Sequence, residues 1–194
     1  MQRIAVVGNS GSGKTTLARQ LAAALAVPHL ELDSVFHQPG WQPLNPNIFR
    51  ERVAAFTSGA SWVVDGNYSA VRDIVWARAD TVVWLDLARS RVMRQVILRT
   101  LRRLATRAEL WNGNRERWRN LVSVNPEESI ILWAWTRHRT YQQTYQAAQA
   151  DPANGHLAFI AVRTIGEAAA LVRRAAVQPA ACEPEVSGGG LAGE

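Results

Sequence analysis

The chain alternates short apolar runs with longer stretches in which apolar residues recur at helical spacing. Leu17, Leu21 and Leu25 mark one such helix, and Pro28 ends it. This alternation predicts an α/β fold whose mostly parallel sheet is covered by helices on both faces. The predicted strands are Ile4–Val7, His29–Leu32, Trp62–Val64, Thr81–Leu85 and Leu157–Val162.

Two intervals are longer or less regular than a plain crossover between strands. The interval 34–60 is rich in proline and tryptophan at Pro39–Pro43, and it then predicts a helix over Ile48–Phe56. The interval 99–119 is rich in arginine and contains the turn-forming run Trp111-Asn112-Gly113-Asn114. Both intervals are therefore candidates for inserts that serve a site rather than the sheet.

A long amphipathic helix is predicted next, with Asn125 as its N-cap and Pro126 at its first position. The segment 176–194 is rich in Pro, Ala, Gly and Glu, which predicts disorder. Cys182 is the only cysteine, so no disulfide can form within the chain. Because neither a signal peptide nor a membrane span is visible, we expect a cytoplasmic protein.

The residues after the first predicted strand fit the phosphate-binding pattern Gly, four residues, Gly-Lys-Ser/Thr. Glycine admits positive φ and lets backbone N–H groups approach a polyphosphate, and the following helix adds its positive end. The Thr15 hydroxyl is expected to bind Mg²⁺. The predicted nucleotide-binding segment is Gly8-Asn9-Ser10-Gly11-Ser12-Gly13-Lys14-Thr15-Thr16.

Lys14 is the only lysine in a chain that otherwise uses arginine for its positive charges. An ammonium is a compact charge that can reach between the oxygens of a β- and a γ-phosphate. A dinucleotide-binding fingerprint would need glycine at position 10, which is Ser10. The sequence therefore predicts binding of a nucleoside triphosphate, with Lys14 as a catalytic residue.

The net charge of +6 is concentrated in one segment. Residues 89–119 carry ten arginines against Glu109 and Glu116, which gives this segment +8 and leaves −2 for the rest. Such a segment suits the phosphates of a nucleotide or of a nucleic acid. The alternative interpretation is a solvated helix in a chain that favours arginine.

Three aspartates stand at the ends of predicted strands, where ligands of open α/β sheets bind. Asp65 and Asp86 are both candidates for the Mg²⁺ site, and Asp65 is favoured because Gly66 lets a substrate approach closely. Asp33 should face the acceptor and orient or deprotonate its hydroxyl, although a capping role is equally open. His37 is a weaker candidate.

Five segments of the sequence have a familiar combination of motifs: the phosphate loop, Leu32-Asp33-Ser34, Pro39-Gly40-Trp41, Trp62-Val63-Val64-Asp65-Gly66-Asn67-Tyr68 and Leu110-Trp111-Asn112-Gly113-Asn114-Arg115-Glu116. Together they resemble the adenylate-kinase-like P-loop proteins that are labelled DNA topology modulation proteins. The resemblance implies a five-stranded parallel sheet of order 2-3-1-4-5 in a kinase-like domain, 1–175. It also implies an acceptor-side insert, 34–60, and a lid-like insert, 105–118.

The implied order places the third strand beside the first, which supports Asp65 as the metal-side acid. A closing lid would bring arginines to the γ-phosphate and to the charge that develops on it. These are Arg99, Arg103, Arg115 and Arg119. Adenylate kinases carry arginines for the acceptor's monophosphate, and here Arg50, Arg52 and Arg72 are only uncertain equivalents.

The sequence thus predicts a Mg²⁺- and ATP-dependent phosphotransferase of the nucleotide-kinase type. Two alternatives remain open. One is a kinase of a non-nucleotide metabolite, whose acceptor would occupy an apolar pocket in Phe36–Asn47. The other is a nucleic-acid-binding regulator switched by ATP, in which the arginines and tryptophans contact phosphates and bases.

Overall fold

A single parallel sheet organises the computed structural model, which describes residues 1–106, 109–115 and 129–177. The strand order is β2-β3-β1-β4-β5, and each neighbouring pair is parallel. The predicted α/β class and strand order are confirmed. The strands are β1 (Arg3–Gly8), β2 (His29–Glu31), β3 (Trp62–Asp65), β4 (Thr81–Leu85) and β5 (Ala158–Val162).

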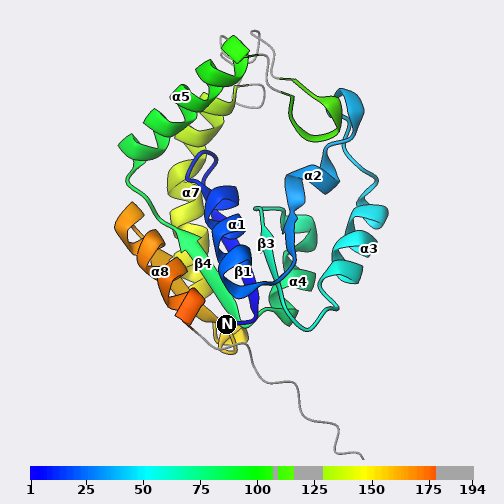
Figure 1. Ribbon diagram of the computed structural model, residues 1–194, viewed down its shortest axis with the longest axis vertical. Helices are drawn as coiled ribbons and strands as arrows, with labels where there is room; N and C mark the ends of the chain where they lie inside the picture. Colours follow the sequence, from blue (N-terminus) through cyan, green and yellow to red (C-terminus); the bar gives the residue numbers. More distant parts are fainter. Residues whose placement is uncertain (107–108, 116–128, 178–194) are drawn as a thin grey trace, which may run out of the picture.

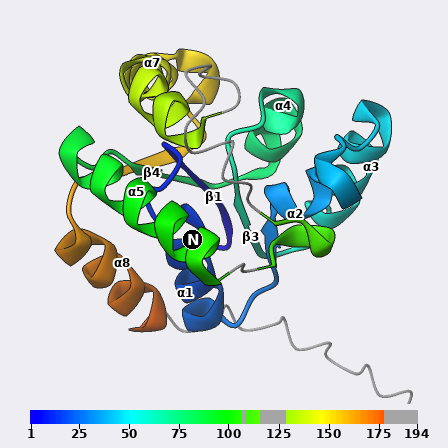
Figure 2. The same cartoon turned by 90° about the horizontal axis from the view of Figure 1, so that it is seen from above.

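Helices cover both faces of this sheet (Figures 1 and 2). One face carries α1 (Lys14–Leu25), α5 (Arg89–Thr106) and α8 (Ile165–Val177). The other carries α3 (Pro46–Phe56), α4 (Ser69–Arg78) and α7 (Ile130–Ala150). The remaining short elements are α2 (Leu32–Phe36), η1 (Pro39–Trp41), η2 (Trp111–Gly113) and η3 (Pro152–Asn154).

The alternation of side chains along β1 divides the core into two parts. Ile4 and Val6 pack with α1, α5 and α8, whereas Ala5 and Val7 pack with α3, α4 and α7. Because both faces of β1 are buried, its sequence is a continuous apolar run. This strand therefore fixes the position of the loop that follows it.

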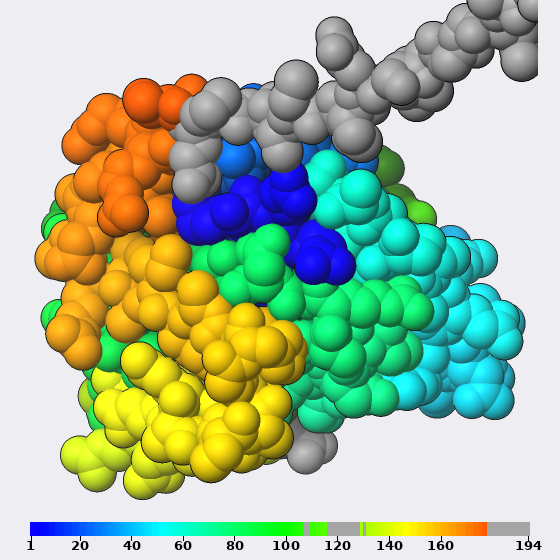
Figure 3. Space-filling model, turned by 90° about the horizontal axis from the view of Figure 1, so that it is seen from below, coloured from blue at the N-terminus to red at the C-terminus, as the bar shows by residue number. Residues whose placement is uncertain are grey.

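The chain reverses its direction of winding at β1, with β2 and β3 on one side of it and β4 and β5 on the other. In open parallel sheets, ligands bind beyond the carboxyl ends of the strands at such a point. The loop after β1 lies at this end of the sheet, in the upper half of Figure 1. Figure 3 shows the opposite end, where the start of the chain lies among other segments of the fold.

Some predicted boundaries were wrong. The second strand ends at Glu31, and α2 starts at Leu32, so Asp33 lies in a helix rather than at a strand end. In contrast, Asp65 belongs to β3. Helix α7 begins at Ile130, with Ser129 Oγ accepting a hydrogen bond from the Leu132 amide at 3.4 Å. Three predicted features lie outside the described residues: Asn125, Pro126 and the tail after 177.

Candidate active site

The phosphate loop connects β1 to α1 and depends on glycine for two separate reasons. Gly8, Gly11 and Gly13 have φ of 145°, 75° and 95°, which favour glycine. A Cβ on Gly8 would lie 2.8 Å from the Leu85 carbonyl oxygen, and one on Gly11 would lie 2.1 Å from Val96 Cγ2. A Cβ on Gly13 would meet nothing within 4 Å. The end of β4 and helix α5 therefore leave no room for a side chain at Gly8 and Gly11, whereas Gly13 faces open space.

Lys14 begins α1 and lines the cleft beside the loop. Its Nζ donates a hydrogen bond to the Asn9 carbonyl oxygen at 3.0 Å. Burial lowers the pKa of Lys14, and the charges of Asp33 and Asp65 partly oppose this shift. A phosphate in the cleft would favour the ammonium form, because an anion close to a buried cation stabilises its charge.

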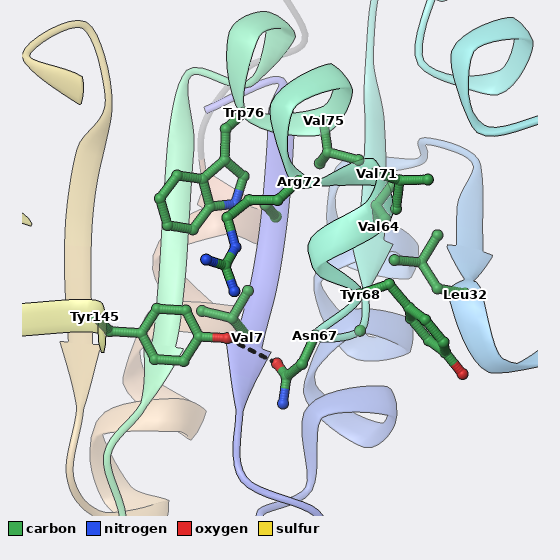
Figure 4. A pocket seen from close by; sticks show the side chains of 12 residues that line it. Val7, Leu32, Val64, Asn67, Tyr68, Val71, Arg72, Val75, Trp76 and Tyr145 are labelled. Atoms are coloured by element: carbon green, nitrogen blue, oxygen red, sulfur yellow. Dashed lines mark hydrogen bonds between the residues drawn. The ribbon is translucent and has the colours of Figure 1, made fainter. Parts of the chain in front are cut away.

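Asn67 anchors the start of the phosphate loop to the end of β3. Its Oδ1 accepts from the Gly8 amide at 3.1 Å, and its Nδ2 donates to the Gly8 carbonyl oxygen. The Tyr145 hydroxyl of α7 donates to the same Oδ1 at 3.0 Å, as the dashed line in Figure 4 shows. The segment after β3 and helix α7 therefore both hold Gly8 in place, through Asn67.

Asn9 makes a second connection between the loop and α7. Its side chain is buried, and its Nδ2 donates to the Ala134 carbonyl oxygen at 2.7 Å and lies 3.4 Å from His138 Nδ1. Its Oδ1 accepts from the Ser10 amide at 2.8 Å. Asn9 was predicted to bind nucleotide, and the structure assigns its side chain to shaping the loop.

Carboxylate oxygens converge on Thr15, the second residue of α1. Thr15 Oγ1 donates to Asp65 Oδ2 at 2.7 Å and lies 3.1 Å from Glu31 Oε1. The buried Asp65 also accepts from His29 Nε2 at 2.7 Å, which fixes its second oxygen. Hard oxygen donors of this kind suit Mg²⁺, which takes one or two protein ligands besides phosphate and water.

The structure brings Asp65, and not Asp86, to Thr15. Asp86 lies beyond β4, where its Oδ1 accepts a hydrogen bond from Gln142 Nε2 at 2.8 Å and its Oδ2 lies 3.8 Å from Arg163 Nε. Among the residues that the structure describes, no group of three or more His, Cys, Asp and Glu side chains could hold a metal. A metal ion at Thr15 and Asp65 would therefore need further ligands, such as phosphate oxygens or water.

Asp33, which was predicted to face the acceptor, lines the same cleft as Lys14 and Thr15. The Tyr68 hydroxyl donates to Asp33 Oδ1 at 2.6 Å and lies 3.4 Å from His37 Nε2. Burial and the charge of Asp33 raise the pKa of Tyr68 well above its usual 10.0, so the hydroxyl remains a donor. Burial also lowers the pKa of His37, against the effect of Asp33.

The predicted lid arginines separate into two groups. Arg99 and Arg103 of α5 line the cleft with Lys14 and Asp33. Arg115 lies in the described segment 109–115, with its guanidinium 3.7 Å from Glu109 and 58% of its side chain exposed. Arg119 lies outside the described residues. The cleft has a volume of about 720 Å³ and is lined by Ser10, Gly11, Gly13, Lys14, Thr15, Thr16, Arg19, Glu31, Asp33, Gln95, Arg99, Arg103, Glu109, Leu110 and Trp111.

Sequence reasoning missed several residues of this site. Glu31 and His29 come from an ordinary strand, and nothing in their spacing indicates that they meet Thr15 and Asp65. Asn67 was noticed only as part of a longer run. The sequence around Trp111 indicates only a turn, yet Trp111 lines the cleft. These residues reach the site because segments far apart in the sequence pack together, and no local sequence pattern indicates that packing.

Within the described part of the chain, no helix is long and apolar enough to cross a membrane. No family model matches the sequence. Over 55 residues the chain is 38% identical to the cytidylate kinases of two strains of Nitratidesulfovibrio vulgaris. The match covers 25% of this chain and 24% of each cytidylate kinase. The chain therefore spans about a quarter of the length of the curated relatives it matches.

Solved structures of shikimate kinases resemble the whole fold. The enzyme from Acinetobacter baumannii in complex with shikimate has a TM-score of 0.51 at 19% identity, covering 90% of both chains. The enzyme from Bacteroides thetaiotaomicron has a TM-score of 0.52 at 13% identity, covering 89% of this chain and 95% of its own. The chain therefore has the P-loop kinase fold of the adenylate-kinase-like type.

Proposed function

We propose that this protein is a Mg²⁺- and ATP-dependent phosphotransferase of the nucleotide-kinase type, which moves the γ-phosphate to a nucleotide or small-molecule acceptor. One observation carries the proposal. Lys14 and Thr15, which suit a triphosphate, line the same cleft as Asp33, which suits an acceptor hydroxyl. Arg99 and Arg103 line it too, and they would stabilise the transferred group.

In the proposed reaction, the acceptor oxygen forms a bond to the γ-phosphorus. The bond between that phosphorus and the β,γ-bridging oxygen breaks, and ADP leaves with the electron pair. Asp33 accepts the hydroxyl proton, with Tyr68 holding its other oxygen. Lys14 and the loop amides hold the β- and γ-phosphates in place, so that positioning supplies much of the rate.

Mg²⁺ bound beside Thr15 and Asp65 would neutralise phosphate charge and orient the triphosphate. The short contact between Thr15 Oγ1 and Asp65 supports this assignment, because it puts a hydroxyl and a carboxylate oxygen side by side at the loop. Glu31 adds a further carboxylate nearby, held by Arg19 at 3.0 Å. The proposal keeps Thr15 as a direct ligand and Asp65 as a direct or water-mediated one.

ADP release from Mg·ATP tests the proposal. It is measured with the purified protein alone and with a panel of nucleoside monophosphates and small hydroxyl compounds. We expect one class of compound to stimulate release strongly, and Lys14→Ala to abolish the stimulation while the protein stays folded. Near-normal turnover in a folded Lys14→Ala variant would refute the assignment.

A nucleic-acid-binding role switched by ATP remains the second candidate. The observation that favours it is the outer face of α5, where Arg91, Arg94 and Arg102 are exposed while Arg99 and Arg103 line the cleft. An exposed basic stripe of this kind suits phosphate backbones. Steeply salt-dependent DNA binding that is lost on reversing these three charges would support this role, and no retention at low salt would exclude it.

A further inference from the structure

The segment 109–115 is docked on the turn that follows α2, although the two are far apart in the sequence (Figure 1). Asn114 is buried, and its Nδ2 donates to the Gln38 carbonyl oxygen at 2.9 Å while its Oδ1 accepts from the Trp41 amide at 2.9 Å. Asn112 Nδ2 donates to the Ser34 carbonyl oxygen at 3.2 Å and also to that of His37. Two asparagine side chains thus bind the backbone of the acceptor-side turn.

Both partners of this contact contain a residue other than glycine with a left-handed backbone conformation. Trp41 has φ of 63° and Asn112 has φ of 57°, in the left-handed region that most side chains avoid. Asparagine tolerates this region, so the strain falls on Trp41, and strained residues of this kind cluster at ligand-binding sites. The docking stabilises Trp41 directly, because it donates through its amide to Asn114 and through Nε1 to the Arg115 carbonyl oxygen at 3.2 Å.

The docked segment presents Trp111 to the cleft. The Trp111 ring stacks on His37 with centroids 5.8 Å apart and an interplanar angle of 24°. His37 lies beside Tyr68, and Tyr68 holds Asp33. Trp111 and Asp33 also line the same cleft. A continuous wall therefore runs from the candidate base to an indole face.

Two of the arginines considered for an acceptor phosphate, Arg50 and Arg72, make their contacts elsewhere. Arg50 makes two hydrogen bonds to the Asp73 carboxylate, at 2.9 and 2.7 Å. The Arg72 guanidinium lies 5.4 Å from the Trp76 ring centroid, within the group of side chains in Figure 4. The wall beside Asp33 is instead aromatic. A ring face could pack on this wall, and the arginines that line the same cleft are assigned to other groups: Arg19 pairs with Glu31, and Arg99 and Arg103 are proposed for the transferred γ-phosphate.

We propose that Trp111, held in place by Asn112 and Asn114, binds the phosphoryl acceptor through its indole face. The acceptor is a ring-bearing alcohol whose hydroxyl meets Asp33, and not a compound anchored by a phosphate of its own. This inference rests on the proposed phosphotransferase function and narrows its acceptor.

Matched pairs of compounds test the acceptor class: nucleosides against their 5′-monophosphates, and cyclic sugars against their phosphates. ADP release from Mg·ATP and equilibrium binding are both measured for each member. We expect the unphosphorylated member of a pair to bind and to stimulate release, with its phosphate at least about tenfold weaker. Preference for the phosphorylated member, or no binding by any member, would overturn the inference.

Variants of the wall test the role of Trp111. Because Trp111→Ala removes the indole surface on which the acceptor would stack, it should raise the acceptor KM about tenfold, with the Kd for ATP changed less than about twofold. Trp111→Phe should restore much of the affinity. Asn112→Ala should raise the same KM, because the exposed amide holds the segment. Matched controls are the exposed Trp135→Ala and Asn47→Ala.

The two proposals fail in different ways. If Lys14-dependent transfer occurs but Trp111→Ala leaves the acceptor KM unchanged, the kinase assignment stands and the indole wall is wrong. If Trp111→Ala abolishes binding of a ring-bearing alcohol and no compound accelerates ADP release, the wall is real and the protein is not a kinase of that compound. A thermal unfolding scan of each variant separates loss of binding from loss of the fold.

Discussion

Burial decides the protonation of single groups around the phosphate loop. Lys14 has its pKa lowered because its ammonium is desolvated, and Tyr68 has its pKa raised for the same reason. Because the Lys14 ammonium has already lost most of its hydration, it can bind an anion strongly with little further displacement of water. The raised pKa of Tyr68 keeps its hydroxyl as a permanent donor beside Asp33.

The lowered pKa of Lys14 predicts how stability without nucleotide depends on pH. Between that lowered pKa and the ordinary 10.5, the unfolded chain binds more protons than the folded one, so stability rises with pH across this window. Lys14→Met should remove this rise and stabilise the nucleotide-free protein at neutral pH. Thermal unfolding of both proteins from neutral to alkaline pH measures the effect. Parallel curves would show that Lys14 carries no buried charge.

Tyr68→Phe tests the orientation of Asp33. The variant keeps the ring that packs against Phe36 and Phe49, and it removes only the donor 2.6 Å from the carboxylate. A hydrogen bond to a charged group is worth about 1.5–3 kcal/mol, so kcat should fall about tenfold or more, with the KM for ATP unchanged. Tyr141→Phe is the matched control. An unchanged kcat would mean that Asp33 needs no such support.

At the scale of elements, α5 determines the shape of the phosphate loop. Its buried stripe is Val92, Val96, Thr100 and Leu104, and Val96 lies against Gly11. The same helix directs Arg99 and Arg103 to the cleft. A shift of α5 would therefore move the loop and the arginines together.

Gly11→Ala should test that packing. Its Cβ would lie 2.1 Å from Val96 Cγ2, and its φ of 75° adds strain, so we expect a loss of about 2–5 kcal/mol in unfolding free energy. Gly13→Ala has strained φ but open space, and should lose about 1–2 kcal/mol. Chemical denaturation measures both. In a Val96→Ala background the cost of Gly11→Ala should shrink, and strictly additive losses would argue against the contact.

The sequence predicted elements well where a local pattern specifies them. The apolar run of β1 and the glycines at 8, 11 and 13 carry their own signal, because burial and positive φ restrict residue type. The resemblance supplied the strand order. The end of β2 was misplaced, since Leu32 is apolar in either a strand or a helix. The Asn112 and Asn114 contacts could not be predicted, because they depend on the pairing of distant segments.

At the scale of the whole molecule, α7 connects the two cores to the loop. Ala134 belongs to the core on one face of the sheet, and Tyr145 to the core on the other. The same helix holds Asn9 through Ala134 and His138, and it holds Asn67 through Tyr145. Nucleotide affinity should therefore depend on a helix whose side chains line no part of the described cleft.

His138 makes that dependence measurable through pH. Burial and Arg89 lower the pKa of His138, against Asp86, so its Nδ1 stays unprotonated and accepts from Asn9. The unfolded chain binds more protons between this lowered pKa and 6.5, so stability is complete above 6.5 and falls as the pH drops through the window. Acid should also weaken ATP binding by disturbing the anchored loop.

His138→Gln supplies an acceptor that does not titrate, and it should flatten both profiles relative to the wild type. ATP affinity and thermal unfolding, measured for both proteins from neutral to mildly acidic pH, give the comparison. Because the ionisation of ATP itself is common to both proteins, the difference between the two curves belongs to His138. Equal slopes would show that α7 supports the loop without sensing protonation, and the connection through Asn9 would then be purely structural.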